Sequence, residues 1–140
     1  MVQNIESLWS PDIKATAMTP LTILKGQAGA LALQTDGVLL AEITREQIEN
    51  GRISLSFDLV APALRGSRHR IMKVIHDKDL PYPADVDAEV FDDIAYATAS
   101  SDHEFTRLVK KVLNSSPVLS VAQSLVARAN EELNATVSAQ

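Results

Sequence analysis

Three carboxylates alternate along one short segment of the chain, at Asp85, Asp87 and Glu89. On a β-strand, alternate side chains share one face and lie about 6.6 to 7 Å apart, so these carboxylates would form a row. A row of this kind can hold a hard divalent cation, meet a basic partner, or act as a solvated face that discourages aggregation. We expect no metal here, because Mg²⁺ sites usually add carboxylates from other segments and Ca²⁺ sites favour loops. The acidic row is therefore predicted to be a solvated face or a partner-binding face.

A basic cluster precedes this segment, with Arg65, Arg68 and Arg70 close to a glycine. Guanidinium groups beside a flexible backbone could bind an anion such as phosphate. The chain as a whole has 13 Lys and Arg against 18 Asp and Glu, a net charge of -5 that repels polyanions. Nucleic-acid binding through residues 65–70 is thus an alternative hypothesis rather than the first one.

A third group of polar residues could line a pocket. His76 is followed by Asp77, and a histidine beside a carboxylate can act as a general base or a metal ligand. His69 lies seven residues earlier, so on a regular strand the two histidines point to opposite faces and cannot share a metal ion. If a curved sheet and a helix enclose a pocket, we expect His76, Tyr82 and Tyr96 to supply its polar groups.

Several kinds of chemistry have no support in the sequence. The chain has no cysteine, which excludes disulfides, thiolate metal sites and a cysteine nucleophile. It also has no phosphate-binding glycine loop, no nucleophile elbow and no helical His-Glu-x-x-His motif. We therefore expect no catalytic residue, no cofactor and no metal.

The absence of disulfides fits a reducing compartment, and no apolar stretch approaches the length of a membrane span. The expected location is the cytoplasm, with no membrane association.

The clearest structural signal is the alternation of residues 52–59. Ile53, Leu55, Phe57 and Leu59 would face a core, and the serines and Asp58 between them would face outward. The preceding Asn50-Gly51 pair is typical of a tight β-hairpin, because both residues tolerate positive φ. Residues 38–44 and 52–59 are thus predicted to be antiparallel neighbours.

A helix is predicted to begin at Thr19-Pro20 and to end at Asp36-Gly37. Within it, small residues form one face, from which we expect close approach to the sheet or to another helix; they are Gly26, Gly29, Ala28, Ala30 and Ala32. The preceding residues 1–18 form a lead-in segment, with Trp9 or Ile13 as the residues expected to hold it to the domain.

The remaining segments complete an α+β plan. Residues 68–76, 86–90 and 94–99 are predicted strands, the last of them short, and two helices follow from the capping box at Ser101 and from Ser116-Pro117. The predicted fold is an N-terminal helix, an antiparallel meander of four to five strands and two C-terminal helices packed on one face of the sheet. Residues 19–134 form one domain and residues 135–140 a frayed tail.

The leading functional hypothesis is a small, non-enzymatic protein-binding domain of the interaction, regulatory or inhibitor type. It would bind a protein partner through a sheet edge or through the acidic strand face. A second copy of the chain is one such partner, which would make the protein a homodimer. The alternative is a ligand-binding or enzymatic domain with a pocket between the curved sheet and a helix.

Overall fold

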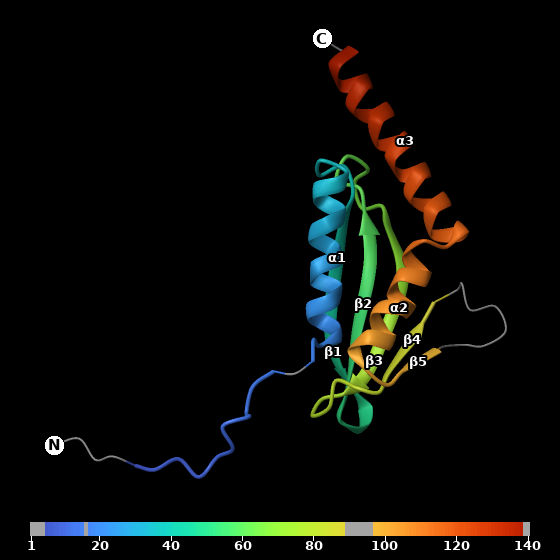
Figure 1. Ribbon diagram of the computed structural model, residues 1–140. Helices are drawn as coiled ribbons and strands as arrows, with labels where there is room; N and C mark the ends of the chain where they lie inside the picture. The colour runs from blue at the N-terminus through green and yellow to red at the C-terminus, as the bar shows by residue number, and fades with distance from the viewer. Residues whose placement is uncertain (1–4, 16, 89–96, 139–140) are drawn as a thin grey trace.

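The computed structural model describes residues 5–15, 17–88 and 97–138, and it has one layer of helices on one layer of sheet (Figure 1). A long helix, α1, precedes the sheet in the chain, and α2 and α3 follow it. The elements in chain order are α1 Pro20–Gln34, β1 Leu40–Ile48, the short 3₁₀ turn Glu49–Gly51, β2 Arg52–Val60, β3 Arg68–Asp77, β4 Ala84–Asp87, β5 Ala97–Ala99, α2 Asp102–Leu113 and α3 Ser116–Ser138.

The five described strands form one antiparallel sheet in the order β1-β2-β3-β4-β5, so each strand pairs with its neighbour in sequence. The α+β fold and the antiparallel meander are confirmed. The hairpin between β1 and β2 turns where it was predicted, with φ of 65° at Asn50 and 69° at Gly51. The fifth strand is the short segment at residues 97–99; residues 94–96 of its predicted range lie outside the described residues.

Two of the helices begin at side-chain caps that the sequence predicted. The Thr19 hydroxyl accepts a hydrogen bond from the Thr22 amide, and Pro20 occupies the first turn of α1. At α2, the Ser101 hydroxyl accepts from the Glu104 amide, and the Glu104 carboxylate accepts from the amide of Ser100. The last helix, α3, continues through residues 135–138, the part assigned to a tail from the sequence. No helix in the described part of the chain combines the length and apolar character needed to cross a membrane.

The core lies between the sheet and the helices. Phe57 and Leu59 of β2 line a hollow together with residues of all three helices, so this face of the sheet is the helix-covered face. Phe105 of α2 is fully buried against it, as are Leu24 of α1 and Leu125 of α3. The opposite face of the sheet has no helix over it in the described structure, and we call it the outer face (Figure 1).

Strand β2 buries the side chains that it places on this outer face. Ser54, Ser56 and Asp58 face away from the helices, as predicted, and all three are buried. Short side chains on β2 lie between longer ones on β1 and β3, which limits the access of water to them. The predicted outward direction is therefore confirmed, and the burial is a feature that the sequence did not predict.

A β-bulge in β3 decides which of its side chains reach the outer face. Phe57 of β2 pairs with Met72, but the next residue, Asp58, pairs with Arg70, so Ile71 is the extra residue. Without the bulge, Arg70 would point to the same face as Met72, toward the helices. The bulge therefore brings Arg70 to the outer face beside Asp58.

The glycines of α1 overturn one expectation. Gly26 and Gly29 are exposed, and a Cβ atom added at either would meet nothing within 4 Å. Among the described residues, the two glycines thus approach neither the sheet nor another helix, whereas Ala28 of the same predicted face does pack against the core. Leu33, on the same helix, is 83% exposed.

Candidate interaction surfaces

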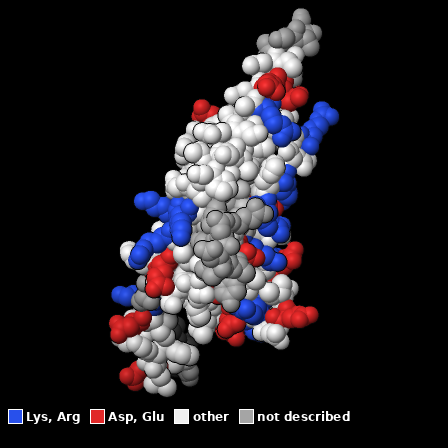
Figure 2. Space-filling view, turned by 90° about the vertical axis from the view of Figure 1, so that its right-hand side faces the viewer, with Lys and Arg blue, Asp and Glu red and all other residues white. Residues whose placement is uncertain are grey.

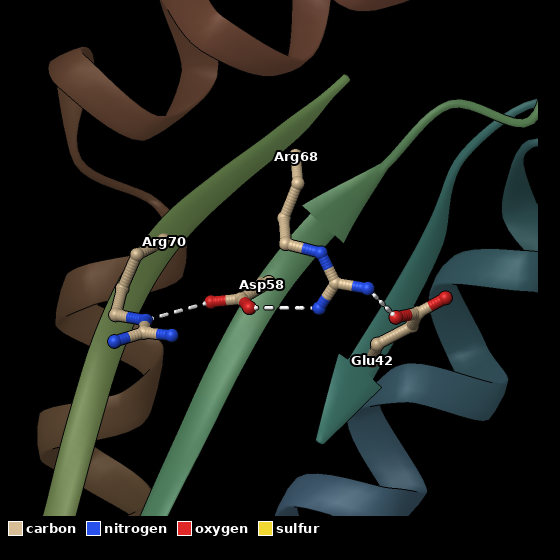
Figure 3. Close-up of polar contacts among 4 residues, drawn as sticks. All are labelled: Glu42, Asp58, Arg68 and Arg70. Atoms are coloured by element: carbon tan, nitrogen blue, oxygen red, sulfur yellow. Dashed lines mark hydrogen bonds and ion pairs between the residues drawn. The ribbon is translucent and has the colours of Figure 1, made fainter. Parts of the chain in front are cut away.

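The outer face carries a chain of ion pairs centred on Asp58 (Figure 3). Asp58 accepts hydrogen bonds from the guanidinium groups of Arg70, at 2.9 Å, and Arg68, at 3.1 Å. Arg68 also donates to Glu42 on β1, so the contacts link three strands. The Asp58 side chain is only 1% exposed, whereas both arginine side chains remain about half exposed. The two arginines thus cover a buried carboxylate and neutralise it.

These contacts keep Asp58 ionised. Burial by itself raises the pKa of a carboxyl group, but the hydrogen bonds and positive charges of Arg70 and Arg68 outweigh it, so the pKa of Asp58 is below its ordinary value of 3.8. The same contacts raise the pKa of each arginine. At neutral pH, Asp58 is therefore a fixed negative charge within the sheet.

Sequence reasoning missed the role of Asp58, although a signal was present. In the hairpin that joins β2 to β3, Val60 pairs with Arg68, and counting outward from that pair places Asp58 opposite Arg70. Opposite charges directly across an antiparallel pair attract each other. The opposite charges were visible in the sequence, but the pairing of Val60 with Arg68 across the loop of residues 61–67 and the burial of Asp58 were not.

The acidic row was predicted on β4, and the structure places its first two members on the outer face. Asp85 lies opposite Ile75, accepts a hydrogen bond from Arg52 at 3.1 Å and accepts another from Thr98 at 2.8 Å. Asp87 pairs with Lys73 across the strands. Glu89 lies outside the described residues. The described part of the row is thus next to basic side chains rather than isolated.

The predicted basic cluster is divided between two places. Arg68 and Arg70 are on the outer face, as described above, whereas Arg65 lies in the loop between β2 and β3. Arg65 lines an open hollow of about 610 Å³ together with Arg128 and Glu132 of α3. Anion binding by the three arginines stays a prediction, but they do not form one loop site.

The three residues proposed as pocket groups are also placed separately. His76 is buried on the helix-covered face, where it pairs with Ile53, and its Nδ1 lies 2.7 Å from the Asp77 carbonyl oxygen. The Tyr82 hydroxyl donates to the Met18 carbonyl at 2.6 Å, and burial followed by the nearby charge of Asp102 raises the pKa of Tyr82 to about 12. Tyr96 lies outside the described residues.

The β3 bulge also changes the relation of the two histidines. His69 pairs with Leu59 and His76 pairs with Ile53, so both point to the helix-covered face, contrary to the prediction for a regular strand. Their positions near opposite ends of β3 still separate them by about 20 Å, too far for one metal ion. Among the residues the structure describes, no three or more His, Asp or Glu side chains could together hold a metal ion.

The helix-covered side has a furrow between α1 and the other two helices. A hollow of about 310 Å³ has mainly apolar walls, and a second hollow of about 210 Å³ adjoins it through shared residues. Neither His76 nor Tyr82 lines either hollow. The larger hollow is lined by Gln27, Ala30, Leu31, Gln34, Phe57, Leu59, Leu113, Asn114, Val118, Leu119 and Ala122.

Apolar residues of α1 and α3 are exposed. Ala30 of α1 and Leu119 of α3 line the larger hollow, whereas Gly26, Gly29 and Leu33 are exposed on α1 but line neither hollow. We call these five residues the helical face. Figure 2 shows a different side of the molecule, the one that lies to the right in Figure 1, away from α1; there uncharged side chains cover much of the upper half, and the charged ones gather mainly at its margins.

Comparison of the chain with models of protein families, with curated proteins and with solved structures finds no match. The chemistry of these surfaces is therefore the basis for a functional proposal.

Proposed function

We propose that this chain is a non-enzymatic protein-binding domain whose partner is a second copy of itself, and that the copies meet through the helical face. The observation that carries the proposal is the exposure of apolar residues on α1, above all Leu33. A helix with few polar residues normally lies largely buried, and α1 has only one charged residue, Lys25, and three other polar residues, Thr22, Gln27 and Gln34. Contact with a second copy would remove its exposed apolar side from water.

The outer face and the sheet edge suit this role less well. On the outer face, Asp58 and Asp85 already pair with arginines of the same chain, so a partner would have to replace those contacts. The β1 edge carries Glu42, Arg45 and Glu46, and charged side chains on an edge strand discourage the addition of another strand.

A second copy is the partner that the distribution of these features favours. Ala30 of α1 and Leu119 of α3 are exposed and line the apolar furrow of the same chain. In a two-fold contact the same surface is used by both copies, so a patch and the hollow beside it can each be occupied twice.

The test is the molar mass of the protein, measured by size-exclusion chromatography with light scattering over a range of concentrations. We expect a dimer or larger assembly for the natural chain, and a shift toward monomer for Leu33→Glu and Leu119→Glu. Gln123→Glu is the matched control, because it places the same charge at an exposed position of α3 that does not line the furrow. A natural chain that stays monomeric at high micromolar concentration would disprove the proposal.

A further inference from the structure

The segment before α1 exposes more large apolar side chains than any helix does. Residues 5–15, which we call the arm, run away from the body of the molecule (Figure 1). Leu8 is 94% exposed and Trp9 79%, and Ile5 and Ile13 are exposed as well. Trp9 is the single tryptophan of the chain. Tryptophan is among the residues most often found as anchors at protein interfaces, so an exposed one needs an explanation.

The arm leaves the body at a fixed point. The Met18 amide donates to the Asp102 carboxylate at 2.9 Å, and the Met18 carbonyl accepts from the Tyr82 hydroxyl at 2.6 Å. Within the arm, the amides of Trp9 and Asp12 bond to nearby serine hydroxyls. We expected Trp9 or Ile13 to hold the arm to the domain, but both are exposed. Met18 makes the contact with the domain instead.

The furrow on the helix-covered side is lined by residues that match the apolar side chains of the arm. Its walls are mainly apolar, and neither of its two hollows is lined by an acidic residue. Lys110 lines the smaller hollow, near the α2 end. The arm contains two acids, Glu6 and Asp12, and one base, Lys14, near the end that joins the body. Arm and furrow are therefore complementary in apolar character, and the two acids of the arm are complementary to Lys110.

We infer that the arm of one copy lies in the furrow of a second copy, with Trp9 as its anchor. This inference rests on the proposed self-association. A second copy is favoured over the arm's own furrow because the arm runs away from α1 (Figure 1), and residues of α1 form one wall of that furrow. Reaching its own furrow would require the chain to reverse beside Met18, where both backbone groups are already bonded.

Fluorescence of Trp9 reports directly on its surroundings. We expect emission typical of a water-exposed indole at the lowest concentrations, and a shift to shorter wavelength over the concentration range in which the molar mass rises. Trp9→Ala should weaken self-association roughly thirtyfold, the effect of losing a strong interface anchor. Gln123→Ala, at an exposed position of α3 outside the furrow, should leave self-association unchanged.

Mixing two full-length variants separates docking onto a second copy from docking within one chain. The donor is Leu119→Glu, which keeps Trp9 but carries a charge in its own furrow, and the acceptor is Trp9→Ala, which has an intact furrow and no tryptophan. Excess acceptor should shift the donor emission to shorter wavelength. An acceptor with both Trp9→Ala and Leu119→Glu should not, and circular dichroism checks that each variant is folded.

The possible outcomes distinguish a failure of the arm inference from a failure of the proposed function. A rise in molar mass with no change in Trp9 emission overturns the arm inference and leaves the proposed function intact. Emission already shifted at the lowest concentration, in a monomer, means that the arm occupies its own furrow and overturns docking onto a second copy. A chain that never associates disproves the proposed function, and the inference fails with it.

Discussion

The outer face of the sheet and the helix-covered side differ in how far their side chains find partners within the same chain. On the outer face, the charged groups described above pair within the same chain, and no buried side-chain nitrogen or oxygen among the described residues lacks a hydrogen-bond partner. On the helix-covered side, the apolar residues outnumber what the core can enclose, so Leu33 and Leu119 remain in water. The polar groups of the outer face are paired within one chain, whereas apolar side chains of the helices remain exposed, and this difference is the reason why the proposed self-association uses the helices rather than the outer face.

The largest effect should come from the core on the helix-covered side. Phe105→Ala removes a ring that is fully buried and that contacts Tyr82 edge-on at 6.3 Å between centroids. We expect the free energy of unfolding to fall by about 3–5 kcal/mol, through lost burial and the cavity that remains. Urea denaturation followed by circular dichroism measures this loss. A loss below about 1 kcal/mol would show that α2 is not packed as described.

Asp58→Ala tests the central contact of the outer face, and its effect should be smaller. The substitution removes hydrogen bonds from Arg68 and Arg70, but these half-exposed side chains can turn to water. We expect a loss of about 1–3 kcal/mol in the free energy of unfolding. Asp77→Ala is the control, because Asp77 is 61% exposed and lies 3.7 Å from Arg52, and it should change stability by less than about 0.5 kcal/mol. Equal losses for the two variants would contradict the special position of Asp58.

The contribution of Asp58 should also depend on pH. Its pKa is lower in the folded protein than in the unfolded chain, so its stabilising effect is fully present above the unfolded value near 3.8 and is lost as the pH falls through the lower folded value. Asp58→Asn keeps the shape and removes the charge. The difference in unfolding free energy between the natural chain and this variant should be constant from pH 7 to about 5 and should shrink below about 4. If this difference in unfolding free energy does not shrink between pH 4 and pH 2, Asp58 is not stabilised by the ion pairs with Arg68 and Arg70.

Local signals were enough to predict the fold. The alternation of residues 52–59, the Asn50-Gly51 turn and the cap at Thr19 each depend on interactions within a few residues. In a meander, every strand pairs with its sequence neighbour, so these local features also determine the topology.

The candidate surfaces could be predicted only in part, because they depend on contacts between distant segments. The bulge at Ile71 follows from how β3 pairs with β2 along its whole length, and it reverses the face of every residue before it in β3. The burial of Asp58 requires two arginine side chains to lie over it. The pattern of small residues in α1 predicts that something packs closely on the helix. It does not distinguish a segment of the same chain from a second copy.

The smallest effect on the free energy of unfolding should come from a substitution of Leu33. Comparing it with Leu24 tests whether the two sides of α1 differ in burial. Leu24 and Leu33 lie on the same helix, but Leu24 is 0% exposed and Leu33 is 83% exposed. Leu24→Ala should cost about 2–5 kcal/mol of unfolding free energy, as for a core leucine. Leu33→Ala should change it by less than about 0.5 kcal/mol when measured at a concentration where the chain is monomeric.

The same pair of variants should behave differently once the copies associate. Binding that occurs only in the folded state adds stability that grows with protein concentration. The natural chain and Leu33→Ala should therefore have matching melting temperatures at low concentration and should diverge as the concentration rises, with the variant melting lower. Matching temperatures at all concentrations would mean that Leu33 stays in water in the assembled protein, and that the exposed side of α1 is not the surface through which the copies meet.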